Sequence, residues 1–134
     1  MPRKTWDEYF LDMAQAVSSR ATCPRIAVGA VVVRANHEVL STGYNGAPSG
    51  YVHCEDEGCL IVKGHCIRPV HAEVNAVARS HRNTGGQFRE EAVTVYSTLK
   101  PCDKCLIAIK YYYPNAILKW SSDEYYRQKG ERNA

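Results

Sequence analysis

Two short motifs, well separated in the chain, contain the side chains with the clearest chemistry. They are H-A-E at residues 71–73 and P-C-D-K-C at residues 101–105. A catalytic zinc ion takes three protein ligands and leaves a fourth position for water, and His71, Cys102 and Cys105 supply three ligands of suitable type. Glu73 lies close enough to His71 in sequence to act on that water as acid and base without binding the metal. The two motifs together predict a hydrolytic zinc site.

Neither motif is specific when it stands alone. A single C-x-x-C pair also occurs in redox proteins and in structural zinc knuckles, and H-A-E occurs often by chance. Their combination, with each motif at the start of a predicted helix, favours the catalytic zinc. The competing interpretation is a purely structural zinc ion, with Glu73 as a surface residue.

Composition limits the class of protein. The chain has 134 residues, enough for one domain with one core, and we treat 1–134 as a single domain. The net charge of +3 suits an anionic substrate but is small for a nucleic-acid groove. No apolar run reaches the ~20 residues of a membrane span, and the residues that follow Met1 contain no apolar core of the kind found in signal peptides. Six cysteines fit metal ligands in a reducing compartment better than disulfides. We expect a cytoplasmic protein.

Periodicity predicts alternating helices and strands. Thr5 and Glu8 have the spacing of a capping box at a helix start, and the β-branched run before Arg34 predicts a buried strand. The predicted helices are Thr5–Ser19, His71–Arg79, Cys102–Tyr112 and 123–129, and the predicted strands are Ala27–Val33, Glu38–Gly43, Ala92–Ser97 and Ala116–Trp120. An opening hairpin followed by interleaved helices and strands predicts an α/β fold, with a mixed sheet and helices on both faces.

Longer motifs carry a resemblance to a known family. They are T-C-P-R (22–25) before V-G-A (28–30), G-Y-N-G (43–46), H-C-E-D-E-G-C (53–59), G-H-C-I-R (64–68) before H-A-E-V-N-A (71–76), and P-C-x-x-C (101–105). With these the chain resembles the cytidine and deoxycytidylate deaminase superfamily, and within it the bacterial and phage dCMP deaminases. The resemblance implies a three-layer α/β/α fold and zinc-dependent hydrolysis of dCMP to dUMP and ammonia, which feeds dTMP synthesis. Family members usually continue with a further strand and helix after the fourth strand. Because few residues follow that strand here, we expect that this fold can lack the last strand of the family.

The resemblance also implies substrate contacts. Glu73 moves the protons, the Ala72 region holds the pyrimidine edge, and Asn45 of G-Y-N-G holds the sugar. Arg25 is the candidate for the 5′-phosphate, because its guanidinium suits phosphate oxygens. The alternatives are an ordinary surface charge for Arg25 and a turn residue that tolerates positive φ for Asn45.

A second group of candidate ligands lies outside the catalytic motifs. It comprises Cys23, Cys54, Cys59, His65 and Cys66, and family members carry a second, structural zinc here. We expect Cys23, Cys54 and Cys59 as ligands, with His65 or Cys66 as the fourth. The alternative is a set of separate buried thiols.

The family resemblance further implies regulation and assembly. Relatives are homohexamers activated by dCTP with Mg²⁺ and inhibited by dTTP, and the candidate effector positions are Ser41, Gly43, Asn45, Gly46 and Gly50. The alternative is a turn rich in glycine for geometry alone. Three other functions stay open: a bifunctional dCMP/dCTP deaminase, a polynucleotide deaminase and a non-catalytic accessory protein. A polynucleotide enzyme would need a basic aromatic groove, so we expect no nucleic acid among the partners. The cytoplasm would be that of a host if the protein is viral.

Overall fold

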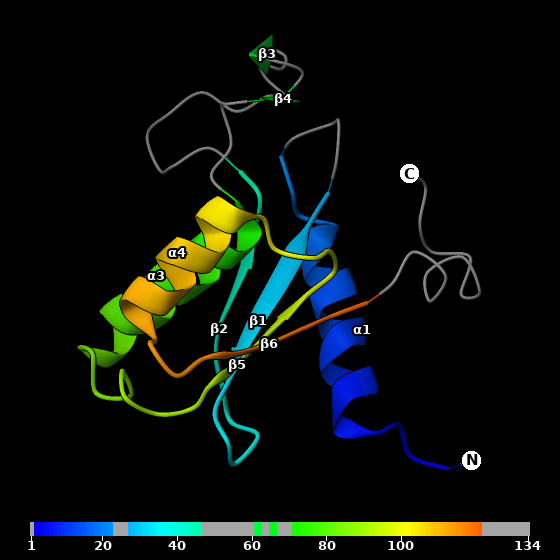
Figure 1. The fold of residues 1–134 in the computed structure, drawn as a ribbon. Helices are drawn as coiled ribbons and strands as arrows, with labels where there is room; N and C mark the ends of the chain where they lie inside the picture. Colours follow the sequence, from blue (N-terminus) through cyan, green and yellow to red (C-terminus); the bar gives the residue numbers. More distant parts are fainter. Residues whose placement is uncertain (1, 23–26, 47–60, 63–64, 67–70, 122–134) are drawn as a thin grey trace.

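The computed structural model describes residues 2–22, 27–46, 61–62, 65–66 and 71–121 (Figure 1). Along the chain its elements are α1 (Trp6–Ser18), β1 (Gly29–Val33), β2 (Val39–Tyr44), β3 (Ile61–Val62), β4 (His65–Cys66), α3 (Ala72–Thr84), β5 (Thr94–Ser97), α4 (Asp103–Tyr112) and β6 (Ile117–Trp120). Among these described helices, none has both the length and the apolar character needed to cross a membrane.

Four of the strands form one mixed sheet in the order β2-β1-β5-β6. Strand β1 is antiparallel to both β2 and β5, whereas β5 and β6 run parallel. Helix α1 covers one face of the sheet, and α3 and α4 cover the other (Figure 1). The predicted mixed α/β sheet with helices on both faces is therefore confirmed. The predicted helix over 123–129 lies outside the described residues.

Strand β1 contributes to the packing on both sides of the sheet. All five of its residues are buried, and successive side chains of a strand point to opposite faces. Val31 and Val33 pack with Phe10 in the core beneath α1. Ala30 and Val32 pack in the larger core beneath α3 and α4. The uninterrupted apolar run predicted this strand because neither face is exposed to water.

The helix ends follow their local sequence signals. Thr5 Oγ1 accepts the backbone N–H of Glu8 at 3.1 Å, and Glu8 Oε1 accepts that of Thr5 at 3.0 Å, so the predicted capping box is confirmed. Helix α3 continues past the predicted end at Arg79 to Thr84, where Gly85 at φ 62° ends it in the left-handed conformation. A contact with a residue outside α3 stabilises this extra turn, because the hydroxyls of Ser80 and Tyr113 lie 2.5 Å apart in the core.

Helix α3 lies unusually close to β2. A Cβ atom added at Gly43 would lie 2.5 Å from the backbone nitrogen of Ala76, so only glycine fits. Ser41 Oγ donates to the Ala76 carbonyl at 2.6 Å, and Asn75 Nδ2 donates to the Tyr44 carbonyl at 2.8 Å. These contacts fix the first turns of α3 against the sheet.

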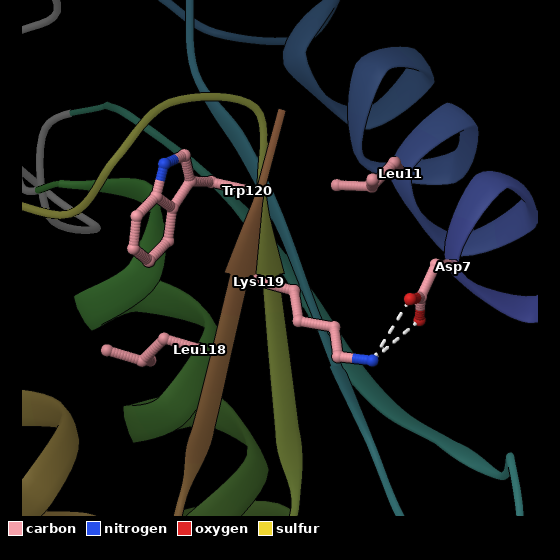
Figure 2. Close-up of a pocket in the computed structure, with 5 residues that line it drawn as sticks. All are labelled: Asp7, Leu11, Leu118, Lys119 and Trp120. Atoms are coloured by element: carbon pink, nitrogen blue, oxygen red, sulfur yellow. Dashed lines mark hydrogen bonds and ion pairs between the residues drawn. The ribbon is translucent and has the colours of Figure 1, made fainter. Parts of the chain in front are cut away.

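On the other face, Asp7 ties α1 to two strands. Its Oδ1 accepts a hydrogen bond from the hydroxyl of Tyr96 at 2.6 Å. Lys119 Nζ donates to both carboxylate oxygens, at 2.9 and 3.0 Å (Figure 2). Asp7 and Lys119 line a surface hollow of about 300 Å³ together with Leu11, Leu118 and Trp120. The hydrogen bonds from Tyr96 and Lys119 lower the pKa of the Asp7 carboxyl below its usual range. Burial and the Asp7 carboxylate raise the pKa of Tyr96.

Asp7→Asn should therefore remove a pH-dependent part of the stability. A carboxyl whose folded pKa is lowered stabilises the protein above its unfolded pKa of ~4. That stabilisation is lost as the pH falls through the folded value. Half of the Asp7 side chain is exposed, so we expect a drop in Tm of only about 2–4 °C at neutral pH. The difference from wild type should shrink toward zero near pH ~2. Thermal unfolding at several pH values measures it, and an equal difference at all pH values would contradict this role.

Candidate functional site

The amino ends of α3 and α4 bring the two sequence motifs together. His71 is the N-cap residue of α3 and Cys102 that of α4, while Cys105 lies in the first turn of α4. His71 Nδ1 lies 2.9 Å from Cys105 Sγ and 3.5 Å from Cys102 Sγ, and the two sulfurs are 3.4 Å apart. Neither N-cap side chain makes a capping hydrogen bond to its own helix. Both side chains instead meet at the point where the helix ends converge.

This donor set fits a zinc ion. The three ligand atoms lie within 4.8 Å of one another, and within the described part of the chain they form the one such group of His, Cys, Asp or Glu residues. Zinc binds nitrogen at ~2.0–2.1 Å and sulfur at ~2.3 Å, so two ligands of one ion lie at most about 4.6 Å apart. One imidazole and two thiols are typical zinc ligands. Three protein ligands leave a fourth position for water.

The thiol of Cys105 shows why the site needs a cation. Its residue is only 1% exposed, and burial, followed by the nearby Glu73 carboxylate and Cys102, raises the pKa of this thiol. The position at a helix N-terminus favours an anion, but at Cys105 the cost of burial is larger. A bound metal reverses this balance, because a coordinating thiol is deprotonated. Metal binding here should release protons and weaken at low pH.

Glu73 lies beside the three donors and is not one of them. It belongs to the first turn of α3 and is 3% exposed. Its Oε1 accepts a hydrogen bond from Ser97 Oγ at 2.5 Å, and its negative charge is near enough to the Cys105 thiol to help raise the pKa of that thiol. A buried carboxylate next to a metal-bound water is suited to proton transfer.

The two predicted substrate residues that the structure describes are both buried. Asn45 is 6% exposed, and its Oδ1 accepts the backbone N–H of Val28 at 2.8 Å. The Asn45 side chain therefore joins the end of β2 to the chain entering β1. Ala72 is the first residue of α3 and is fully buried. Their contacts with a substrate stay predictions.

Three of the predicted effector positions make packing contacts. Ser41 and Gly43 pack beneath α3, as described above. A Cβ atom at Gly46 would lie 2.9 Å from Thr22 Oγ1. These contacts are those expected of the alternative interpretation, a segment whose small residues serve geometry, and they do not test effector binding.

The remaining predicted site residues lie outside the described residues, wholly or in part. Wholly outside are Cys23, Arg25, Gly50, Cys54 and Cys59. His65 and Cys66 form β4, whose backbone pairs with β3, and only their backbone is described. The second zinc site therefore stays a prediction.

The motifs did not reveal Ser97. Along β5 it follows Val95 on the face toward α3, and Val95 is part of the larger core. The detectable signal was a serine at an inward-facing strand position, because a buried hydroxyl needs a hydrogen-bond partner. Which partner it has could not be deduced, since Glu73 is distant in sequence.

Comparison with known proteins shows which family and which relatives the sequence matches. The sequence model of the family described as "Cytidine and deoxycytidylate deaminase zinc-binding region" matches residues 4–118. ComE operon protein 2 of Bacillus subtilis (strain 168) is 38% identical over 109 residues, which cover 81% of this chain and 56% of that protein. The chain thus spans about half the length of this Bacillus relative. The deoxycytidylate deaminase of Mycobacterium phage D29 is 38% identical over 118 residues, covering 78% of this chain and 86% of the phage protein.

A solved structure has the same fold. The dCMP deaminase from the cyanophage S-TIM5, in complex with dCMP and dUMP, superimposes with a TM-score of 0.63 at 20% sequence identity. The match covers 90% of this chain and 100% of that one. The expected cytidine-deaminase-like fold is confirmed.

Proposed function

We propose that this chain, which belongs to the cytidine and deoxycytidylate deaminase zinc-binding family, is a hydrolase that converts dCMP and water to dUMP and ammonia. The observation that carries the proposal is the buried Glu73 carboxylate, held by Ser97 beside the converged donors of His71, Cys102 and Cys105. The name of the phage relative favours dCMP over other cytosine compounds.

The chemistry divides between the metal and the acid/base residue. His71, Cys102 and Cys105 would hold a zinc ion, which would lower the pKa of a bound water toward ~7. Glu73 accepts a proton from the water that attacks C4 of the cytosine ring. It delivers that proton to N3. It then carries the remaining proton of the new C4 hydroxyl to the amino group, so that the C4–N bond breaks, ammonia leaves and the C4 carbonyl of dUMP forms. Burial of Glu73 keeps bulk water from competing for these protons.

We assign the substrate contacts to residues that belong to the sequence motifs. A Cβ atom at Gly43 would lie 2.6 Å from the Ala72 carbonyl, so the G-Y-N-G segment begins against the helix turn that carries Glu73. This supports Asn45 as the residue that holds the sugar and the Ala72 backbone as a contact of the pyrimidine edge. Arg25 is assigned to the 5′-phosphate, because a guanidinium matches phosphate oxygens in charge and geometry.

A second, structural zinc ion is also proposed. Its ligands are Cys23, Cys54 and Cys59, with His65 or Cys66 as the fourth. A segment with few apolar residues gains folding free energy from a metal, and the surplus of cysteines beyond Cys102 and Cys105 supports the assignment.

Regulation and assembly complete the proposal. We propose a homohexamer activated by dCTP with Mg²⁺ and inhibited by dTTP. Ile107 and Tyr111, one turn apart on α4, are 73% and 70% exposed, which supports contact between copies of the chain. Effector contacts are assigned to the segment that contains Ser41, Gly43, Asn45, Gly46 and Gly50. We propose that the enzyme acts in the cytoplasm, or in the cytoplasm of a host cell if the protein is viral.

Glu73→Gln should abolish deamination while the protein folds and binds zinc as wild type does. A general acid/base typically supplies at least ~10²-fold in rate, and glutamine cannot shuttle protons. Glu90→Gln, at a residue whose side chain is 77% exposed, is the matched control and should keep wild-type activity. Ammonia release is measured with dCMP, dCTP, deoxycytidine and an oligonucleotide. Activity of Glu73→Gln within a few-fold of wild type, or wild-type activity on the oligonucleotide alone, would overturn the proposal.

Metal analysis should find about two zinc ions per chain in the wild type. Cys105→Ser should lose one of them together with all activity, because serine is a poor zinc ligand. Cys54→Ser should lose the other and lower Tm more than it lowers the rate. A wild-type content of one zinc ion, unchanged in Cys54→Ser, would reject the structural site.

Steady-state rates should respond to nucleotide effectors. An effector must bind one conformation of the oligomer better than another, and the expected coupling is ~1–3 kcal/mol. We expect dCTP with Mg²⁺ to sharpen the dependence of rate on dCMP concentration and dTTP to lower the velocity. Hyperbolic curves that superimpose with and without each nucleotide would show an unregulated enzyme.

A further inference from the structure

We propose that Ser97 is a positioning residue that holds the carboxylate of Glu73 in the orientation needed for proton transfer. The hydrogen bond from Ser97 Oγ to Glu73 Oε1 measures 2.5 Å. Ser97 is fully buried and Glu73 is 3% exposed, so water does not compete for this contact. The effect on catalysis rests on the proposed deaminase function, whereas the contact itself is a property of the fold.

The hydroxyl of Ser97 is itself held in place. The backbone N–H of Leu99 donates to Ser97 Oγ at 3.4 Å. One oxygen lone pair is thus engaged from the loop side, and the hydroxyl proton is directed to Glu73. The bonds form a chain in one direction, from the Leu99 amide through Ser97 to the carboxylate.

The backbone at Ser97 is fixed from both sides. In the sheet, Ser97 lies opposite Ala30 of β1 and opposite Trp120 of β6. The next residue, Thr98, continues the attachment, because its N–H donates to the Gly29 carbonyl at 3.0 Å and its Oγ1 accepts the Gly29 N–H at 3.1 Å. A serine on such a rigid strand end is a suitable anchor for a longer, more flexible side chain.

Glu73 benefits from such an anchor. The terminal torsion of a glutamate is broad and roughly two-fold, so packing alone does not set the carboxylate plane. A hydrogen bond to one oxygen restricts that torsion. Ser97 also lies on the strand that leads to the C-x-x-C motif. Its hydrogen bond therefore fixes the position of the Glu73 carboxylate relative to Cys102 and Cys105.

Three variants at this position distinguish the effect of the hydroxyl group from the effect of side-chain volume. Ser97→Thr keeps the hydroxyl and adds a methyl group, Ser97→Val has the shape of threonine without a hydroxyl, and Ser97→Ala removes the hydroxyl without adding volume. We expect kcat for dCMP to fall about 10-fold or more in the Val and Ala variants, since misplacing a catalytic group by 1 Å can cost ~10²-fold. The Thr variant should stay within about threefold of wild type, and KM should change less than about twofold in all three. Zinc content should be unchanged.

Ser80→Val is the matched control. Ser80 is also fully buried, and its hydroxyl lies 2.5 Å from that of Tyr113, but this contact joins α3 to the residue after α4. Its loss should lower Tm while kcat stays at the wild-type value. Equal loss of kcat in the Ser80 and Ser97 variants, or full kcat in Ser97→Ala and Ser97→Val, would overturn the positioning role.

A double-mutant cycle tests the contact without any activity. Tm is measured for Ser97→Ala, for Glu73→Ala and for the double variant. Interacting residues give a combined shift that differs from the sum of the single shifts, and strictly additive shifts would overturn the proposal. If the wild type deaminates none of the cytosine compounds, the proposed function fails on its own, and the cycle still decides whether Ser97 holds Glu73.

Discussion

The close approach of α3 to β2 is the constraint on which the site depends. The two backbones meet at Gly43, where any side chain would collide with the helix, and the hydrogen bonds of Ser41 and Asn75 hold the contact on either side. His71 and Glu73 both lie at the start of this helix. A shift of α3 away from the sheet would therefore move His71 and Glu73 together, away from the cysteines of α4. Packing at one glycine thus sets the geometry of the chemistry.

The metal and the fold stabilise one another through the second helix. Cys105 is buried between the two helix ends, and burial and the Glu73 carboxylate raise the pKa of its thiol, so the metal-free protein keeps this thiol neutral. A divalent cation held by His71, Cys102 and Cys105 would compensate the negative charge of the thiolates and would join the N-termini of α3 and α4. Part of the binding free energy of the metal therefore becomes stability of the fold, and acid opposes both by protonating the ligands.

What the sequence could predict depended on whether the signal was local. The capping box at Thr5 and the valine run of β1 are local patterns, and both were confirmed. The end of α3 was predicted too early because its last turn depends on the contact of Ser80 with Tyr113, which no local pattern records. Ser97 was missed for the same reason, since its role depends on strand register. The meaning of Asn45 stayed open because the residue types that suit a tight packing contact also suit a ligand contact.

The register of β5 joins the two faces of the protein. Adjacent residues of a strand point to opposite sides, and here Tyr96 reaches Asp7 of α1 while Ser97 reaches Glu73 of α3. A slip of one residue would exchange the two sides. A slip that moved Tyr96 into the place of Ser97 would bury the large phenol beside Glu73 and leave Asp7 facing Val95, which has no hydroxyl. The pairing of Val31 with Tyr96 and of Ala30 with Ser97 therefore does more than close the sheet. It ensures that the α1 tether and the Glu73 contact can form only together, so the stability of the α1 layer helps to maintain the geometry of the site on the opposite face.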